Sequence, residues 1–426
     1  MRSLLLIGVL ATSASASPLG IAWSEKVTCE AQDYLPGVTI GETSVAWITK
    51  GKLVRRGLAK GESLAGWKLK HAERVFVTHL ADDLIVVRDP FGFTAYDGAG
   101  KTRFHRIVKT NKAHWNALAV GGGKILFEVA GSIEADDLTG KKLWSVPFGK
   151  KEFTAGLELG TTLAFLVTGD AKTQTIHALA LGDGHEAWKW TSEPGTIDTT
   201  IQRDGDVVAV SGHDTLQLLD ATGVVTWKAA VPSQRVIQID AATIYTAGSV
   251  GGLFAYERAS GKQRWKRDTV TTTGLPVVAT SATSVYAQDR DRLVELDPKT
   301  GAERASLGVA KQQLAARGST IVACDGGKKL VAYAPTAPDL KLEKATVTGK
   351  VTAEYLTPDV TVSIAGATGK LDGESFKLSI NGRGRYSVWV VASGVWHEAK
   401  SKVVDLTGKG AYDVGTVDVE PEVEGD

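Results

Sequence analysis

The sequence has few of the residues that build metal sites. Only two cysteines occur among its 426 residues, Cys29 and Cys324, and neither belongs to a Cys-x-x-Cys pair. The eight histidines are scattered, without a spacing that brings two of them to one face of a strand or helix as zinc ligands. We therefore expect no metal site.

A surplus of charge and long apolar segments are also missing. With 49 basic and 48 acidic residues, the chain lacks the basic excess that attracts nucleic acid or anionic lipid. Beyond the N-terminal stretch, no segment approaches the ~20 apolar residues that a transmembrane helix requires. These absences argue against nucleic-acid binding and against a transmembrane segment.

The N-terminus has the three parts of a secretory signal. Arg2 supplies the positive charge, residues 4–10 supply a short apolar stretch, and residues 14–16 (Ala-Ser-Ala) supply small side chains before a cleavage point at Ser17. We expect residues 1–16 to be removed and the mature chain to be periplasmic or extracellular. No cysteine follows the cleavage point directly, so we do not expect a lipoprotein.

A β-rich apolar run recurs eight times, with a period of about 40 residues that is typical of a repeat architecture. Tight polar or small turns, such as 82–83 (Asp-Asp) and 121–123 (Gly-Gly-Gly), introduce the runs. The runs lie at residues 45–47, 84–86, 125–127, 163–165, 207–209, 244–246, 285–287 and 321–323.

A second pattern follows the runs: a strand, a polar residue, a turn closed by glycine, and a strand with a tryptophan. The segment "LFAYERASGKQRW", ending at Trp265, is one of the best copies, and the weaker copies include one that ends at Ala305. Glycine suits the turn because a positive φ costs it little. Large aromatic side chains are mostly buried, so we expect a row of them to pack between neighbouring repeats. The row consists of Trp23, Trp67, Phe104, Trp144, Trp188, Trp227 and Trp265.

Each period holds about four short strands joined by hairpins, which is the content of one propeller blade. The sequence predicts an all-β fold, with an eight-bladed β-propeller over residues 17–336. The eighth copy lacks its tryptophan strand, and we expect residues 21–24 to supply that outer strand and close the ring. Cys29 and Cys324 would then lie on one face, where a disulfide is expected and two buried free thiols are the alternative.

The repeat ends before the C-terminus. We expect a linker at 337–344, after which residues 345–420 carry six candidate strands with period-2 alternation. Six strands in this length favour a small β-sandwich over two further blades. Residues 421–426 are expected to form a solvated acidic tail.

Two family resemblances rest on these motifs. The repeat in "LFAYERASGKQRW" resembles that of pyrroloquinoline-quinone-enzyme-like propellers, a family that includes quinoprotein dehydrogenases and non-enzymatic BamB-like scaffolds of outer-membrane assembly. Residues 345–420, with "VTGKVT" and "VTVSIAG", resemble a carboxypeptidase-regulatory-like, transthyretin-like sandwich. The first resemblance implies that the tryptophans pack between blades, and the second implies an accessory module for folding, adhesion or binding.

The first resemblance also implies which residues a quinoprotein dehydrogenase would need. Quinoprotein dehydrogenases use a calcium site of carboxylates and an amide, a general-base aspartate and typically two adjacent cysteines, and this chain has no adjacent cysteines. Aspartates at predicted turns could share one face, but we interpret them as turn formers. They are Asp89, Asp170, Asp214 and Asp289. We expect no catalytic residue and no cofactor.

The remaining hypothesis is a scaffold that binds proteins of the cell envelope and is monomeric by itself. Two unusual loops could contact the partner. Their candidate binding residues are Phe91, Phe93, Asp289, Arg290 and Arg292. Two alternatives stay open: a divergent quinone-dependent oxidoreductase, and a carbohydrate-binding or adhesive surface protein in which the aromatic side chains stack sugars.

Overall fold

The computed structural model describes most of the chain, and every regular element in the described residues is a β-strand, with no helix among them. The all-β prediction is confirmed for this part. No helix there has the length and apolarity to cross a lipid bilayer. The described residues are 20–27, 38–69, 75–81, 83–89, 91–108, 117–129, 131–148, 153–169, 172–193, 200–212, 214–231, 234–248, 252–268, 278–281, 283–289, 292–309, 313–325, 329–334, 343–352, 360–364, 367–382, 384–392, 395–406 and 410–418.

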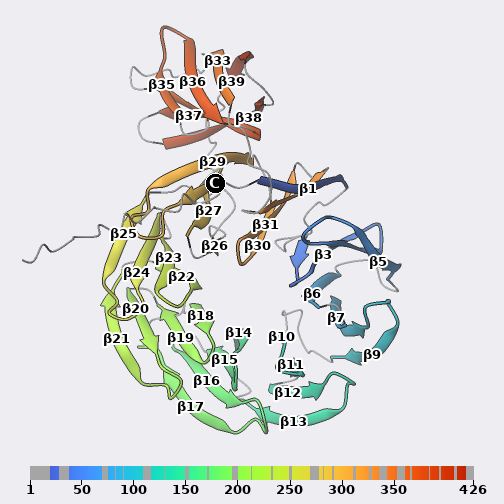
Figure 1. The fold of residues 1–426 in the computed structure, drawn as a ribbon. Coiled ribbons are helices and arrows are strands. Elements are labelled where there is room, and N and C mark those ends of the chain that lie inside the picture. The colour runs from blue at the N-terminus through green and yellow to red at the C-terminus, as the bar shows by residue number, and fades with distance from the viewer. Residues whose placement is uncertain are drawn as a thin grey trace, which may run out of the picture.

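Four-stranded antiparallel sheets, which we call blades, stand around a common centre (Figure 1). Blades 1 to 3 consist of β2 (Val38–Ile40), β3 (Ser44–Thr49), β4 (Lys52–Gly57) and β5 (Ser63–Lys68); β6 (Phe76–Leu80), β7 (Ile85–Asp89), β8 (Gly92–Tyr96) and β9 (Thr102–Ile107); β10 (Leu118–Gly121), β11 (Lys124–Val129), β12 (Ser132–Asp137) and β13 (Lys142–Pro147). Blades 4 and 5 consist of β14 (Phe153–Leu159), β15 (Leu163–Gly169), β16 (Gln174–Ala180) and β17 (Glu186–Thr191); β18 (Thr200–Asp204), β19 (Val207–Ser211), β20 (Thr215–Leu219) and β21 (Val225–Ala230). Blades 6 and 7 consist of β22 (Gln234–Ile239), β23 (Thr243–Gly248), β24 (Leu253–Glu257) and β25 (Gln263–Arg267); β26 (Val278–Thr280), β27 (Val285–Asp289), β28 (Arg292–Leu296) and β29 (Glu303–Val309).

One further blade, the composite blade, combines strands from distant parts of the chain. It contains β30 (Gln313–Arg317), β31 (Thr320–Asp325), β32 (Lys329–Ala334) and, at its outer edge, β1 (Gly20–Lys26). β1 pairs antiparallel with β32, from Gly20 opposite Ala334 to Lys26 opposite Lys329. The N-terminal strand therefore occupies the place that the fourth strand of a hairpin pair has in the other blades.

Glycine turns close the outer hairpins, as in blade 5. Gly223 has φ 83°, a left-handed conformation that favours glycine, and its N–H donates to the carbonyl of Asp220 (3.0 Å). The Asp220 carboxylate accepts hydrogen bonds from the N–H groups of Thr222 (2.8 Å) and Val224 (3.1 Å). The side chain of Asp220 therefore stabilises the turn by accepting hydrogen bonds from its backbone N–H groups.

The apolar core lies between neighbouring blades. β15 is buried at every position, because blades cover both of its faces, and its sequence is accordingly a continuous apolar run. Ile176 of blade 4 and Val208 and Val210 of blade 5 belong to one buried cluster. A blade is therefore stabilised mainly by its neighbours.

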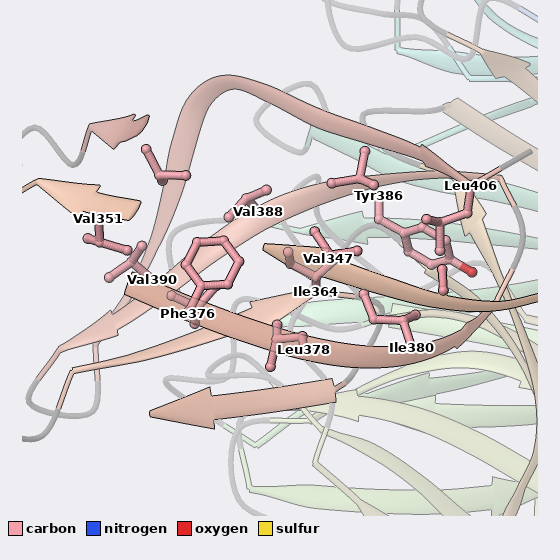
Figure 2. Close-up of a cluster of buried hydrophobic side chains, with 14 of the residues drawn as sticks. Val347, Val351, Ile364, Phe376, Leu378, Ile380, Tyr386, Val388, Val390 and Leu406 are labelled. Atoms are coloured by element: carbon pink, nitrogen blue, oxygen red, sulfur yellow. The ribbon is translucent and has the colours of Figure 1, made fainter. Parts of the chain in front are cut away.

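The C-terminal module, β33–β39, contains two sheets around a core of its own. β36 (Ser375–Gly382), β33 (Glu343–Thr352) and β39 (Gly410–Asp418) form one sheet; β35 (Ala367–Lys370), β34 (Thr361–Ile364), β37 (Gly384–Ala392) and β38 (Val395–Leu406) lie in the other. Figure 2 shows side chains of both sheets, such as Val347, Phe376 and Val390, pointing into the shared core. β37 also pairs in parallel with β29 of blade 7, so the module continues the sheet of that blade.

Candidate protein-interaction site

At seven joints between neighbouring blades, a large aromatic ring lies on a glycine of the next blade. A Cβ atom at any of these glycines would stand closer than 3.0 Å to ring atoms, so only glycine leaves room for the ring. The contacting pairs are Trp23–Gly61, Trp67–Gly100, Phe104–Gly140, Trp144–Gly184, Trp188–Gly223, Trp227–Gly261 and Trp265–Gly301.

Most of these indoles also donate a hydrogen bond to the backbone of the same turn. The donors and acceptors are Trp23 Nε1 to Leu58 O (2.8 Å), Trp144 to Leu181 (3.2 Å), Trp188 to Ala221 (2.9 Å), Trp227 to Arg258 (2.7 Å) and Trp265 to Pro298 (3.0 Å). The buried Nε1 of Trp67 has no hydrogen-bond partner among the described residues. The aromatic side chains of the row therefore pack between blades, where their contacts with the glycine turns cover ring faces that could otherwise stack on sugars or bases.

The Asp89–Phe93 loop exposes one of its two phenylalanines. Phe91 is 70% exposed, and its N–H donates to Asp89 Oδ1 (2.7 Å), which holds the loop in an Asx turn. Phe93 is only 1% exposed and meets Phe127 of blade 3 edge-on, with 5.0 Å between ring centroids. The prediction that Phe93 contacts a partner is therefore wrong, because the strand's alternation turns its ring into the joint between blades.

A second exposed apolar side chain, which the sequence did not single out, belongs to the strand whose end is hydrogen-bonded to the backbone of Phe91. Ile107 is 65% exposed at the end of β9, opposite Gly92 in the register, and Val108 N donates to Phe91 O (2.8 Å). We call Phe91 and Ile107 the Phe91–Ile107 patch. The sequence contained a signal for the exposure of Ile107: by the alternation of β9 its side chain lies on the face opposite Phe104, which packs against the next blade.

The residue next to Ile107 anchors the patch to blade 3. Arg106 Nε donates to Asp136 Oδ2 (2.9 Å), and the guanidinium lies 5.7 Å from the ring centroid of Phe127. Asp136 is fully buried; burial raises its pKa, although the hydrogen bond from Arg106 opposes that effect. Blade 2 therefore presents Phe91 and Ile107 from a fixed edge.

The second predicted loop is buried at both of its described ends. Asp289 is 3% and Arg292 7% exposed, and Arg292 Nη2 donates to Asp289 Oδ2 (2.6 Å). Arg292 Nη1 also donates to Glu303 (3.1 Å), and Arg267 of blade 6 pairs with Glu303. The prediction that Asp289 and Arg292 contact a partner is wrong, because these charges neutralise one another inside the joint. Arg290 lies outside the described residues.

The predicted disulfide cannot be placed. Cys29 and the side chain of Cys324 lie outside the described part of the structure, in which the backbone of Cys324 stands opposite Leu330 in β31 and β32.

Several carboxylates in the described residues hold turns or joints between blades. No group of three or more His, Cys, Asp or Glu side chains there is arranged to hold a metal ion. Asp206 of blade 5 accepts hydrogen bonds from the N–H groups of Thr161 (2.7 Å) and Leu163 (3.2 Å) of the blade 4 turn. Burial alone would raise the pKa of Asp206, but hydrogen bonds from Thr162, Leu163 and Thr161 lower it. Asp170 lies outside the described residues.

A groove of about 690 Å³ lies between the turns of blades 5 and 6. Its arginines are already paired: Arg258 Nη1 donates to Asp204 (2.5 Å), and Arg264 Nη1 donates to Thr243 (3.0 Å). Because Arg258 and Arg264 already donate to groups of the protein, the groove has fewer guanidinium N–H groups for an anion than its two arginines suggest.

Solved structures match about three quarters of the chain. BamB from Moraxella catarrhalis is 15% identical, with a TM-score of 0.57, over 74% of this chain and 99% of that one. The C-terminal WD40 domain of Sif2 is 10% identical (TM-score 0.54; 75% and 99% covered). A quinohemoprotein alcohol dehydrogenase from Pseudomonas putida HK5 is 12% identical (TM-score 0.52; 76% and 77% covered). At these identities the likeness shows the fold alone, which is propeller-like.

The sequence comparisons point to one family. No curated protein matches the chain. The family model described as "Outer membrane protein assembly factor BamB" matches residues 129–272, 172–334 and 222–367, which together extend over more than half of the 426 residues. The chain therefore belongs to the BamB-like family of propeller proteins with pyrroloquinoline-quinone-type repeats.

Proposed function

We propose that this chain is an exported, non-catalytic scaffold that binds proteins of the cell envelope, in the manner of an outer-membrane assembly factor. Membership of the BamB-like family supports the proposal. The observation that carries it is the Phe91–Ile107 patch, two large apolar side chains exposed on a rigid blade edge. Exposed aromatic and aliphatic anchors on a preorganised surface are the usual basis of protein recognition.

The proposal includes the closed architecture. We propose eight blades over residues 17–336, closed by β1, with a disulfide between Cys29 and Cys324, after removal of a signal peptide at 1–16. The pairing of β1 with β32 and the contact of Trp23 with Gly61 support the closure. A closed ring leaves only short, protected strand edges and holds its outward-facing loops at fixed positions.

The C-terminal module completes the scaffold. We propose that residues 345–420 are a carboxypeptidase-regulatory-like sandwich that adds a second contact surface to a monomeric chain. Two sheets around one apolar core support a sandwich, and the parallel pairing of β37 with β29 attaches it to blade 7.

Chemical crosslinking in native envelopes, followed by purification of the tagged full-length chain, tests the function. We expect envelope proteins that assemble outer-membrane components to be recovered, and to be lost when Phe91→Asp and Ile107→Asp are combined. The matched control is Leu143→Asp, at a 44% exposed position of blade 3 outside the patch. Equal recovery with both variants would contradict the role of the patch.

A quinone titration separates the scaffold from an oxidoreductase. The purified chain, mixed with pyrroloquinoline quinone and Ca²⁺ and then desalted, is expected to retain no quinone absorbance. Stoichiometric retention with dye reduction in the presence of an alcohol would replace the proposal by the enzyme hypothesis. Saturable binding on a glycan array, with no envelope protein recovered, would favour the carbohydrate-binding alternative.

A further inference from the structure

The outer corner of blade 2 has counterparts in other blades. In each, an N–H just after the outer strand donates to a carbonyl at the start of the preceding strand or just before it. The pairs are Leu69 to Gly51 (2.8 Å), Val108 to Phe91 (2.8 Å), Phe148 to Gly131 (2.9 Å), Ser192 to Gln174 (2.8 Å) and Val231 to Asp214 (3.0 Å). These hydrogen bonds identify equivalent positions without reference to sequence similarity.

Among these five described corners, only that of blade 2 has large apolar side chains at both positions. Phe91 corresponds to Gly51, Gly131, Gln174 and Asp214. The residues equivalent to Ile107 are Lys68, Pro147, Thr191 and Ala230, none of which is a large apolar residue. The charge of Lys68 and the missing N–H of Pro147 protect these strand edges against pairing with another chain, and Ile107 has neither feature.

In blade 7, the equivalent corner pairs with an additional β-strand. The bulges of the β8–β9 and β28–β29 pairs lie at matching places, so Gly308, opposite Arg292, corresponds to Ile107, opposite Gly92. β37 pairs with β29 there, with Gly308 opposite Gly384 and Val309 beside it. The same molecule therefore adds a strand at this corner of one blade and leaves the equivalent edge of β9 uncovered by any described strand.

The backbone and side chains of β9 define the chemistry of an occupant. Because Val108 N points to Phe91, the N–H of Ile107 points to the open edge. The strand Thr102–Ile107 contains no carboxylate, and Arg103 and the preceding Lys101 are exposed. An occupant that pairs with this edge therefore gains from an apolar side chain near Phe91 and from carboxylates near Arg103.

We infer that the outer edge of β9 binds an extended, acidic and apolar segment of a partner protein as an added β-strand, as β37 is added to β29. This inference rests on the proposed function and names its site. Main-chain hydrogen bonds supply affinity in strand addition, and the pocket for a side chain supplies specificity.

Site-specific photocrosslinking in native envelopes tests the inference with the full-length chain. A photoreactive amino acid replaces Phe91 in one variant and Val224, a 59% exposed turn residue of blade 5, in the control. We expect a discrete adduct from position 91 and none from position 224. Mass spectrometry of the adduct is expected to identify a short partner segment that contains both an apolar residue and at least one Asp or Glu.

A proline substitution distinguishes strand addition from simple apolar contact. Ile107→Pro removes the outward N–H, and Pro147 shows that the fold accepts proline at the equivalent position. We expect Ile107→Pro to reduce the adduct by about tenfold, the effect of one lost hydrogen bond. Ile107→Thr, which keeps the N–H and the β-branched shape, is expected to reduce it less. Unchanged melting temperatures verify that the variants fold.

Each other outcome overturns the inference. Equal loss with Ile107→Pro and Ile107→Thr would show a side-chain contact only, an adduct with a second copy of this chain would show self-association, and a helical or basic segment would contradict the stated chemistry. Recovery of envelope partners without an adduct at position 91 would overturn this site and leave the proposed function intact. Loss of all partners would overturn both.

Discussion

The two joints of blade 7 differ in construction. Toward blade 6, the ring of Trp265 lies on Gly301 and its Nε1 donates to Pro298 O (3.0 Å), while Arg267 pairs with Glu303 across the joint. Toward the composite blade, Leu307 shares a buried cluster with Ile321 and neighbouring apolar residues. There, Ala305 stands at the register position that holds the aromatic residue in other blades.

The difference shows what the aromatic–glycine contact requires. It needs an outer hairpin with a glycine turn on the receiving blade, and the composite blade takes its outer strand from the N-terminus instead. The joint toward the composite blade therefore depends on ordinary apolar packing, and the edge of β29 is covered by β37. The two joints should therefore respond differently to substitution.

The largest effect is expected at the aromatic joint. Trp265→Ala is expected to lower the free energy of unfolding by about 3–5 kcal/mol, because a buried indole is removed and a cavity remains. Urea titration followed by circular dichroism measures the change. Trp265→Phe keeps the ring and loses the hydrogen bond to Pro298, so a loss of about 1 kcal/mol is expected for this control.

A somewhat smaller effect is expected on the other side of blade 7. Leu307→Ala is expected to cost about 2–4 kcal/mol, because Leu307 is buried without a partner of indole size. The same titration measures it. A cost above that of Trp265→Ala would reverse the ranking of the two joints.

The glycine side of the aromatic joint can be tested by itself. Gly301→Ala is expected to cost about 2 kcal/mol, since φ is +70° and a new Cβ would stand 2.7 Å from the Trp265 ring. In the Trp265→Ala background the steric part of this cost is expected to disappear. Additive costs in the double-mutant cycle would show that ring and glycine are not coupled.

The joint between blades 4 and 5 contains a carboxylate, that of Asp206, so its contribution to stability should depend on pH. The lowered pKa of Asp206 means that its ionised form stabilises the native state, fully above the unfolded-state value near 3.8, and that this stabilisation is lost as pH falls through the folded-state pKa. Asp206→Asn is therefore expected to cost about 1 kcal/mol at pH 7, and less as the pH approaches 3. Denaturant midpoints of both proteins between pH 3 and pH 7 measure the difference, and a constant difference would contradict the role of the charge.

The smallest effect on stability is expected away from every joint. Phe91→Ala is expected to change the free energy of unfolding by less than about 0.5 kcal/mol, because its side chain is 70% exposed. Urea titration provides the measurement. A large loss would show that Phe91 stabilises its blade, and its exposure could then no longer be attributed to binding.

The amino-acid sequence by itself determined the repeat, the all-β elements and the aromatic row, because alternation and glycine turns act over a few residues. It also indicated residues 21–24 as the outer strand of the last repeat, and the structure pairs this segment with β32. The tertiary structure decided which loop residues are exposed. Phe91 and Phe93 stand two residues apart, yet the neighbouring blade buries only Phe93.

The same reason separates the two predicted loops. Asp289 and Arg292 look like surface charges in the sequence, but Arg267 and Glu303 reach them from other strands and complete a buried ionic network. Local sequence determines how a strand and its turn fold. Whether a side chain meets solvent or another blade depends on how the blades are placed around the ring, and that placement arises from contacts between residues distant in the chain.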